Sequence, residues 1–556
     1  MIFDNTFDQG VFMSKFLQLY DISYQLPNGN ILFSQVSGSF SAKITALIGR
    51  NGVGKSLLAQ ILSGEIKPTQ GTVLNADSSY YLPQTYEISA DTTISDLLGI
   101  QDILDALVRI SLGSIDEADF SLVGDHWNIE SEAVALLTKW GLSAYSLQSP
   151  ATQLSGGEQM RIRIAAAFLS AKTTLILDEP SNHLDLHYKS KLWEMIQAWS
   201  GEVILITQDR YLLDQVDVIA ELTKEGLIWF QGSFAEFRVL REAEKQRAID
   251  ELATIKIEEK KRLKVAQQQL ERQQKRSAEA NRARGNQNQA KILMDAQKNR
   301  SDHTSGKMQL KYDRAKEVGR ARIETAQKAV EPTANIVLHQ MEKAAHQSAI
   351  IAEITDLKLP FVMPQVAPLS LTIRSGERMA IVGRNGIGKS LLLKVIAGLI
   401  PAADGVIETF SPAVYLDQHL SLFDPNKSVL EQISQNRTKE EISQLRMQLS
   451  QLGLPAKDIE KPSMHLSGGE RLKSALALIL YGQSPVELLM LDEPNNHLDL
   501  ESLAALESML QQYHGALMVV SHDSIFLETI GIDQYLTVTD QAWEVSYKMP
   551  DLRRDF

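Results

Sequence analysis

Two stretches decide the fold of this chain: GRNGVGKS at residues 49–56 and GRNGIGKS at residues 383–390. Each is followed by the same two further motifs in the same order. LSGGE occurs at 154–158 and 466–470, and LDEP occurs at 177–180 and 491–494. Three motifs that recur in order and with similar spacing indicate a duplicated domain. The sequence therefore predicts two related halves, one around each GKS stretch.

The pattern GxxxxGKS is typical of a phosphate-binding loop between a buried strand and a helix. Apolar runs at 44–48 and 379–382 precede the loops and favour strands, and the apolar segments behind the loops favour helices. An ordinary Gly-rich turn is the alternative for one copy, but two copies with the same flanks make it negligible. The predicted nucleotide-binding residues are Gly49, Asn51, Gly52, Gly54, Lys55 and Ser56 in the first half and Gly383, Asn385, Gly386, Gly388, Lys389 and Ser390 in the second.

Each part of such a loop has a chemical role. Glycines let backbone N–H groups turn toward phosphate oxygens, and the following helix N-terminus adds a favourable dipole. Lys55 and Lys389 are expected to contact the β- and γ-phosphates of ATP. Ser56 and Ser390 are expected to ligate Mg²⁺. ATP and Mg²⁺ are therefore the predicted cofactors.

Each LDEP motif ends an apolar run, TLILDEP or ELLMLDEP, that reads as a buried strand. An acid at the carboxyl end of a parallel strand faces the nucleotide crevice. Asp178 and Asp492 suit the Mg²⁺ shell, and the glutamates that follow them suit polarisation of the attacking water. Glu179 and Glu493 are thus the predicted catalytic carboxylates. An acidic surface pair, the alternative, would leave the buried strand before it unexplained.

Composition excludes several other kinds of chemistry. The 556 residues include no Cys, which rules out disulfides, thiolate zinc sites, iron–sulfur clusters and cysteine nucleophiles. No run of about 18 apolar residues is long enough to span a bilayer. The first residues, MIFDNTFDQGVFMSKF, lack the basic and apolar regions of a secretion signal. We expect a cytoplasmic protein.

The net charge of −13 is unevenly distributed. Residues 241–330 hold 23 Lys and Arg against 13 Asp and Glu, a net of +10, which leaves −23 for the rest of the chain. This stretch is rich in helix-forming residues, and Leu263, Ala266 and Leu270 keep a narrow apolar stripe. It predicts a basic helical hairpin that suits RNA phosphates. A solvated helical pair without a partner is the alternative.

A phosphate-binding loop followed by LSGGE and then by an LDEP strand resembles the ATP-binding cassette superfamily. In that family LSGGE completes the nucleotide site of the opposite cassette. The resemblance implies two composite ATP sites in a monomeric chain that closes on ATP and opens after hydrolysis. It assigns Ser155, Gly156 and Gly157 to the site built on Lys389, and Ser467, Gly468 and Gly469 to the site built on Lys55.

The resemblance extends to less specific positions. Gln84 and Gln418, in YLPQ and YLDQ, match the glutamine loop of the family, which contacts nucleotide and Mg²⁺. Tyr24 and Phe361 are candidate aromatic stackers for adenine. Packing against a core is the commoner role of an aromatic residue in a strand.

The position that senses the γ-phosphate in this family differs between the halves. SHDSIFL carries His522, which resembles the sensing histidine, whereas TQDRYLL carries Gln208. Glutamine donates a hydrogen bond but neither shares a proton nor carries charge. Two readings stay open: the first site turns over poorly, or Gln208 substitutes adequately.

The predicted fold class is α/β, with two P-loop ATP-binding cassette domains in tandem joined by a long α-helical hairpin linker. Each cassette should have mostly parallel strands, an antiparallel edge and a helical lobe that carries LSGGE. The predicted boundaries are 16–235, 236–349 and 350–548, with an insertion within about 90–150 and a hairpin turn near 281–288 or 301–306.

SNHLD at 181–185 and NNHLD at 495–499, together with the long basic linker, resemble the ABC-F family of translation-associated ATPases. That resemblance implies an ATP hydrolase that acts on the ribosome, with residues 241–330 reaching rRNA and the P-site tRNA. The alternative is a tandem-cassette ATPase subunit of a membrane transporter. Within ABC-F, the sequence leaves open a housekeeping translation factor or an antibiotic-resistance factor.

Overall fold

The structure is a computed structural model that describes most of the chain. It covers residues 16–284, 310–327 and 349–550, apart from residues 87, 171, 362–365, 418–423, 435–436, 452–453, 455, 467, 482–485, 497 and 540–541. The chain divides into two compact units. One unit holds both halves of the repeat, and the other is Ala235–Thr333.

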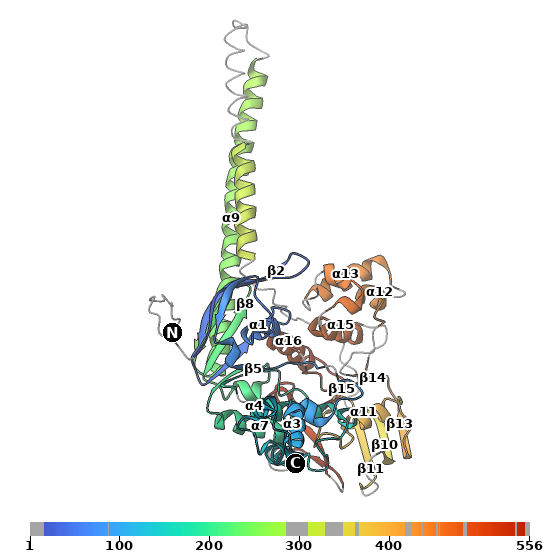
Figure 1. The fold of residues 1–556 in the computed structure, drawn as a ribbon. Helices are drawn as coiled ribbons and strands as arrows, with labels where there is room; N and C mark the ends of the chain where they lie inside the picture. The colour runs from blue at the N-terminus through green and yellow to red at the C-terminus, as the bar shows by residue number, and fades with distance from the viewer. Residues whose placement is uncertain are drawn as a thin grey trace. The chain divides into compact units, whose positions relative to one another are not determined.

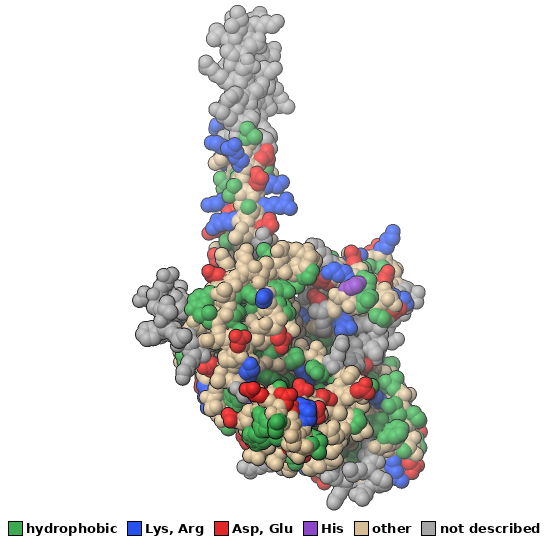
Figure 2. Space-filling view, in the orientation of Figure 1, with side chains coloured by type: hydrophobic (Ala, Val, Ile, Leu, Met, Phe, Trp, Pro, Cys, Tyr) green, Lys and Arg blue, Asp and Glu red, His purple; other side chains and the backbone are tan. Residues whose placement is uncertain are grey.

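The second unit contains the predicted basic linker (Figure 1). Helix α9 runs over Phe234–Arg284, and a second helix covers residues 310–327. Figure 2 shows Lys and Arg side chains projecting from both edges of the described part of this unit. Both predicted turn regions include residues outside the described ranges, and α9 itself continues through Arg284.

The two linker helices meet along the predicted apolar stripe. Leu263, Ala266 and Leu270 are half-buried, and Ile255 is buried about two turns before Leu263. Glu259 is also buried in this row, and its Oε1 lies 3.2 Å from Arg322 Nη1 of the second helix. These contacts pair helical segments about 60 residues apart in the sequence, as a helical hairpin requires.

Gly319 makes room for the Glu259 carboxylate. A Cβ added at Gly319 would lie 2.8 Å from Glu259 Oε2, closer than non-bonded atoms approach. A buried carboxylate with one partner on each helix specifies how the helices align, because a shift would leave the charge unpaired. Arg262 Nη1, 3.2 Å from Glu259 Oε1, provides the second ion pair.

Each half of the first unit is built around a six-stranded sheet, as the sequence predicts. In the first half the strand order is β5-β6-β7-β3-β8-β9, and β9 is an antiparallel edge on five parallel strands. The strands are β3 Ile44–Ile48, β5 Ser79–Leu82, β6 Thr174–Asp178, β7 Glu202–Ile206, β8 Val218–Thr223 and β9 Gly226–Gln231. Buried apolar runs such as LIL in β6 form the central strands because helices cover both faces of a parallel sheet.

The second half repeats this topology with the order β14-β15-β16-β12-β17-β18. Its strands are β12 Arg378–Val382, β14 Ala413–Leu416, β15 Leu488–Asp492, β16 Ala516–Val520, β17 Gln534–Val538 and β18 Trp543–Ser546. The predicted α/β fold class with two tandem cassettes is confirmed.

Each half also has a three-stranded antiparallel sheet, in the orders β2-β1-β4 and β11-β10-β13. Its strands are β1 Leu17–Gln25, β2 Ile31–Phe40 and β4 Gln70–Leu74 in the first half and β10 Ile350–Lys358, β11 Leu369–Arg374 and β13 Asp404–Thr409 in the second. Their inner faces pack on the first helix after each phosphate-binding loop. That packing positions each phosphate-binding loop relative to the six-stranded sheet of its half.

The helices of the two halves correspond in position. The helices around the sheet are α1 Lys55–Leu62, α6 Gly156–Leu169, α7 Leu186–Ala198 and α8 Arg210–Leu213 in the first half, and α11 Lys389–Ile396, α15 Gly468–Leu480, α16 Leu500–Gln511 and α17 Ser524–Thr529 in the second. Single-turn 3₁₀ helices cover Ala76–Ser78, Ala151–Gln153 and Ser463–His465.

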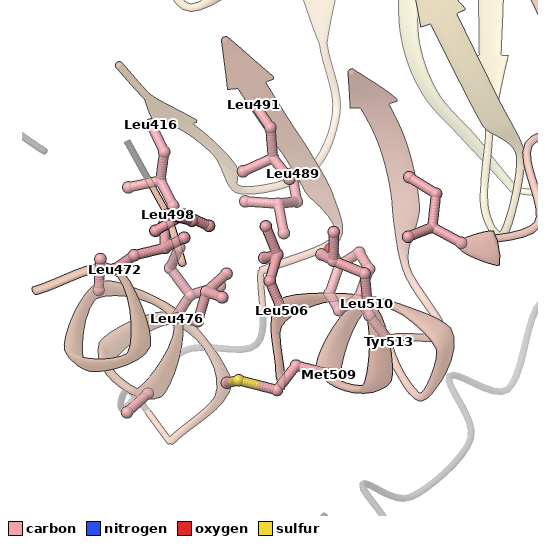
Figure 3. Close-up of a cluster of buried hydrophobic side chains, with 14 of the residues drawn as sticks. Leu416, Leu472, Leu476, Leu489, Leu491, Leu498, Leu506, Met509, Leu510 and Tyr513 are labelled. Carbon is pink, nitrogen blue, oxygen red and sulfur yellow. The ribbon is translucent and has the colours of Figure 1, made fainter. Parts of the chain in front are cut away.

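Apolar contacts between sheet and helices form the core. In the second half, Leu489 and Leu491 of β15 face Leu472 of α15 and Leu506 and Met509 of α16, all with 5% exposure or less (Figure 3). Burying such a side chain contributes about 1.5–3 kcal/mol. The strand that ends in LDEP and the helix that begins at LSGGE are therefore held together by one apolar core.

The helical lobes account for the predicted insertion. The first lobe has α2 Ile94–Leu97, α3 Gln101–Ser111, α4 Glu117–Val123 and α5 Ile129–Lys139, and the second has α12 Val429–Ile433, α13 Lys439–Gln451 and α14 Ala456–Ile459. Arg109 of α3 donates twice to Asp119 Oδ1 of α4, at 2.9 and 2.6 Å. Within the described residues, the insertion is thus an enlarged helical lobe.

Over the described parts of the chain, no helix has both the length and the apolar character needed to cross a membrane.

Two equivalent glycines test the repeated packing. Gly201 and Gly515 are 314 residues apart and precede β7 and β16. A Cβ on Gly201 would lie 1.7 Å from the carbonyl oxygen of Thr173, so Gly201→Ala must displace backbone at the amino ends of the interior strands β6 and β7. We expect a loss of more than ~2 kcal/mol in the free energy of unfolding.

Gly99→Ala is the matched control, because Gly99 has a positive φ of 68° and no atom within 4 Å of an added Cβ. That change should cost only about 1 kcal/mol of backbone strain. Thermal unfolding followed by circular dichroism compares the two. Equal melting temperatures for the two variants would contradict the packing argument.

Candidate nucleotide-binding sites

The phosphate-binding loops have the backbone that their glycines predict. Gly54 and Gly388 are the N-caps of α1 and α11, with left-handed φ values of 105° and 106°. A Cβ on Gly54 would also lie 2.6 Å from Leu32 Cδ2. Only glycine fits both constraints. In a loop of this kind, left-handed backbone lets successive N–H groups turn toward an anion.

The two loop lysines lie over their own loops. Lys55 Nζ donates to the carbonyl oxygens of Gly49 and Arg50 at 2.7 and 3.1 Å. Lys389 Nζ donates to the equivalent carbonyl oxygens of Gly383 and Arg384 at 2.7 and 2.8 Å. Burial lowers the pKa of both ammonium groups, and the carboxylates nearby oppose that shift. Each ammonium is thus placed at the mouth of its loop.

The hydroxyl and the carboxylate predicted to hold Mg²⁺ lie together. Ser390 Oγ donates to Asp492 Oδ1 at 2.8 Å, and Ser56 makes the same hydrogen bond to Asp178. A hydroxyl and a carboxylate are the oxygen donors that Mg²⁺ takes beside phosphate oxygens and water. The donor set fits Mg²⁺·ATP, and the ion would supply charge neutralisation between the β- and γ-phosphates.

Two tyrosines that sequence reasoning missed orient these aspartates. Tyr81 Oη donates to Asp178 Oδ2 at 3.1 Å, and Tyr415 Oη donates to Asp492 Oδ2 at 2.9 Å. The strands β5 and β14 bring them there because they are direct neighbours of β6 and β15. Both tyrosines stand in the runs YYLPQ and VYLDQ, in which only the glutamine was predicted to have a function.

Glu179 and Glu493 occupy strained backbone positions. Their φ values are +50° and +48°, in a region that costs a non-glycine residue of order 1–3 kcal/mol. Burial is the main cause that raises the pKa of Glu179 to about 8 and that of Glu493 to about 7. A strained, partly buried carboxylate beside the Mg²⁺ ligand is the arrangement expected of a base for the attacking water.

The switch residues make the same contact to their loops. His522 Nε2 lies 3.1 Å from Asn385 Oδ1, and Gln208 Nε2 donates to Asn51 Oδ1 at 2.9 Å. Burial and the ammonium groups of Lys389 and Lys189 hold the pKa of His522 well below its usual range. The imidazole is therefore neutral near pH 7, so the two switch positions do not differ in charge.

The halves differ instead in how the switch residue meets the catalytic glutamate. His522 Nε2 lies 3.5 Å from Glu493 Oε1. In the first half a backbone N–H of Gln208 donates to the Glu179 carboxylate, and Gln208 Oε1 is buried without a hydrogen-bond partner. An unpaired buried acceptor is unfavourable. The asymmetry in turnover stays a prediction, now with this geometric basis.

The LSGGE serine begins a helix in the first half. Ser155 is the N-cap of α6, and its hydroxyl donates to Glu158 Oε2 at 2.8 Å in a capping box. Gly157 lies against the loop after LDEP, since an added Cβ would be 2.9 Å from the carbonyl oxygen of His183. Gly469 is closely packed too, since an added Cβ would be 2.4 Å from Ser502 Oγ at the start of α16.

Each phosphate-binding loop contacts the NHLD loop of the opposite half. The backbone N–H of Asn51 donates to Asp499 Oδ2 at 3.0 Å, and Asn385 Nδ2 donates to the carbonyl oxygen of His183 at 2.9 Å. Arg50 Nη2 also lies 2.9 Å from Glu501 Oε2. Sequence reasoning used NHLD only as a family marker and missed these roles.

A cavity of about 290 Å³ lies between the halves at the second site. It is lined by Asp185, His187 and Tyr188 from the first half and by Gly383, Arg384 and His522 from the second. The cavity thus opens beside the phosphate-binding loop, the switch histidine and the opposite NHLD loop, as a composite site requires.

The remaining predicted residues are less informative. Gln84 follows β5 directly and is half-buried, whereas Gln418 and Ser467 lie outside the described residues. Tyr24 packs against the core of the first half, and the Phe361 side chain is 98% exposed. The roles of Gln84, Gln418, Tyr24 and Phe361, like that of Ser467, stay predictions.

Comparison with known proteins identifies the class. A family model described as "ABC transporter" matches residues 34–182 and 366–496. Each match includes a phosphate-binding loop, an LSGGE motif and an LDEP strand. The two matches span half of the chain, which therefore belongs to the ATP-binding cassette family, with two cassettes in tandem.

The chain also resembles particular relatives over most of its length. It is 29% identical over 532 residues to the ribosome protection protein VmlR of Bacillus subtilis (strain 168), covering 93% of this chain and 85% of that protein. It is 28% identical over 562 residues to the energy-dependent translational throttle protein EttA of Mycobacterium tuberculosis (strain ATCC 25618 / H37Rv), covering 93% and 90%. The predicted ABC-F membership is confirmed. The chain is an ATP hydrolase, and domains of this family in general bind nucleotide with Mg²⁺.

Solved structures agree on the fold. The chain matches the RNase-L Inhibitor with a TM-score of 0.55 at 17% identity, covering 94% of this chain and 89% of that one. It matches a complex of archaeal ribosomal stalk protein aP1 and archaeal ribosome recycling factor aABCE1 with a TM-score of 0.54 at 18% identity, with the same coverage. At these identities the likeness shows the fold alone.

The two catalytic glutamates are predicted to be unequal. Glu493→Gln should lower kcat for ATP hydrolysis by ~100-fold or more at its site while leaving ATP affinity within ~3-fold, because the carboxylate acts on the water and not on the bound ground state. Glu179→Gln should lower the total rate less, since in its site the switch residue meets the glutamate through its backbone N–H and not through its side chain. ATPase rates and nucleotide titrations of the single variants measure this. Equal losses in rate would contradict the asymmetry.

Proposed function

We propose that this chain is a cytoplasmic ABC-F ATPase that acts on the ribosome. Its helical linker unit contacts rRNA and the P-site tRNA. The observation that carries the proposal is the basic unit inserted between two cassettes that share their ATP sites. The similarity to VmlR, a ribosome protection protein, and to EttA, a translational throttle protein, supports it.

The charge distribution favours RNA as the partner of the linker. The net charge is +10 over residues 241–330 and −23 elsewhere. Arg272, Lys275 and Arg276 are exposed along α9, where a phosphate backbone has access to them. Cationic side chains release counterions when they neutralise phosphates, which gives sequence-independent affinity that falls with salt.

The composite sites explain how ATP controls that binding. Each phosphate-binding loop needs the opposite half, so Mg²⁺·ATP stabilises the closed pair of cassettes. We propose that Lys55, Lys389, Ser56, Ser390 and the LSGGE motifs hold the nucleotides, and that Glu179 and Glu493 polarise the attacking water. Hydrolysis then separates the cassettes within one monomer and releases the factor. ATP acts as a timer for ribosome occupancy.

A membrane-transporter ATPase remains the rival class. Such a subunit has cassettes but no need for a basic helical unit of this length between them. It would fractionate with membranes, whereas the proposed factor would fractionate with ribosomes. One experiment distinguishes the two.

The test uses the Glu179→Gln, Glu493→Gln double variant, which should retain ATP and stay closed. In sucrose gradients with ATP it should sediment with ribosomes. Replacing Arg272, Lys275 and Arg276 with Ala should reduce co-sedimentation by at least ~10-fold at about 150 mM salt, because three phosphate contacts are lost.

The control replaces Lys67, Lys224 and Lys439 with Ala, which removes the same charge from exposed positions on the cassettes. This variant should co-sediment as the parent does. If both triple variants lose binding equally, net charge and not the linker is responsible. If the parent itself never sediments with ribosomes, the ribosomal function is wrong.

A further inference from the structure

The segment that carries the first switch residue is docked on the second half. Arg210, two residues after Gln208, donates to both carboxylate oxygens of Glu507 on α16, through Nη1 at 2.6 Å and Nη2 at 3.1 Å. The two side chains are only 4% and 7% exposed. Tyr211, the next residue, packs against the apolar core of the second half. A bidentate pair of this kind fixes the orientation of its two partners as well as their distance.

Helix α16 reaches the first nucleotide site with its other end. Its N-cap is Asp499, whose Oδ2 accepts from the backbone N–H of Asn51 in the first phosphate-binding loop at 3.0 Å. Gln208 Nε2 donates to the side-chain Oδ1 of the same asparagine at 2.9 Å. The contacts therefore form a closed ring that leaves Asn51 through the switch residue and returns to it through α16. The pair of Arg210 and Glu507 joins the two sides of this ring.

The switch segment of the first site is held by both halves. Asp209, which lies between Gln208 and Arg210, caps α8 by accepting from the backbone N–H of Tyr211 at 3.0 Å. Its Oδ2 also lies 2.6 Å from Lys189 Nζ on α7. The first half thus holds Asp209, and the second half holds the residue that follows it. The position of Gln208 over the loop depends on both anchors.

The repeat does not reproduce the anchor that crosses between the halves. An offset of 314 residues aligns Arg210 with Ser524 and Glu507 with Trp193. Serine and tryptophan side chains carry no charge, so these positions cannot form an equivalent ion pair. The second phosphate-binding loop nevertheless contacts the opposite NHLD loop. The loop contact is therefore common to both sites, whereas the ion pair belongs to the first site alone.

We propose that Arg210 and Glu507 are a positioning pair for ATP hydrolysis at the site built on Lys55. The pair fixes the switch segment relative to α16, so that Gln208 and the N-cap of α16 meet Asn51 in one arrangement. Docking of the second half and placement of the switch residue are thereby coupled at this site. The inference concerns ATP hydrolysis alone and is independent of the ribosomal role.

The two sites can be measured separately in glutamate backgrounds. In Glu493→Gln, turnover comes from the site built on Lys55, and Glu507→Gln should lower its kcat by ~10-fold with the KM for ATP within ~3-fold. A displaced switch segment slows chemistry, while the loop still binds nucleotide. This change leaves Arg210 in place, because its charge also acts on Asp523 beside the second switch residue. In Glu179→Gln, where turnover comes from the second site, the same change should leave kcat within ~2-fold.

A double-mutant cycle distinguishes a positioning role from general damage. In the Glu493→Gln background, Gln208→Ala removes the side chain that the pair is proposed to place. Adding Glu507→Gln to this variant should therefore lower kcat by no more than ~3-fold further, because coupled residues give non-additive effects. Two independent roles would give losses that multiply in full.

A second variant guards against misfolding. Removal of one partner of a buried pair leaves an unpaired charge, whereas replacement of both partners by apolar residues is often neutral for stability. Arg210→Met combined with Glu507→Leu should therefore fold and still lower kcat by ~10-fold in the Glu493→Gln background. The matched control is Arg446→Met with Glu460→Leu, the same changes at an exposed ion pair of the second helical lobe. It should leave kcat within ~2-fold in both backgrounds.

Each contrary result is informative. Equal losses from Glu507→Gln in the two backgrounds, no loss in either, a loss of ATP affinity in place of kcat, or full multiplication with Gln208→Ala would each overturn the proposal. So would normal turnover in the folded variant that lacks both charges, or an equal loss in the control. An absence of turnover in Glu493→Gln would overturn it too, since the first site would then have no hydrolysis for the pair to position.

Discussion

The phosphate-binding loop of each half contacts the NHLD loop of the other half. Asn51 donates its backbone N–H to Asp499, and Asn385 donates its amide to the carbonyl oxygen of His183. A nucleotide bound by one loop therefore rests on a surface supplied by the other cassette. This contact makes the two sites composite, and it is why separation of the halves has a chemical consequence. The sheets, the helical lobes and the helix caps hold the two phosphate-binding loops and the two NHLD loops in position for these contacts.

The two sites are copies that have diverged at a few positions, and each change has a different physical effect. Gln208 and His522 bond the same loop asparagine, and a lowered pKa keeps the imidazole neutral, so charge does not distinguish them. The two sites differ instead in how the switch residue contacts the catalytic glutamate, because the His522 side chain lies 3.5 Å from Glu493 Oε1. The two sites thus share a backbone arrangement but differ in the contacts of their side chains.

Much of this was predictable because it is local. The glycines of the loops specify left-handed turns, apolar runs specify central strands, and the LSGGE serine specifies a helix cap at Ser155. Tyr81 and Tyr415 escaped prediction because their aspartate partners lie about 80 to 100 residues away, and strand order alone makes them neighbours. Glu259 escaped because its position reads as a solvated face until Gly319 and Arg322 of the other helix are beside it.

The sequence by itself determined the duplication, the phosphate-binding chemistry, the α/β class and the basic linker, because each is written in contiguous motifs or in composition. Only the tertiary structure decided which groups meet across the halves: Asp499 with Asn51, Asn385 with His183, and Arg210 with Glu507. Arg210 and Glu507 are 297 residues apart. Their pairing depends on how two folded surfaces dock, and the free energy of that docking is distributed over many buried atoms that no local pattern encodes.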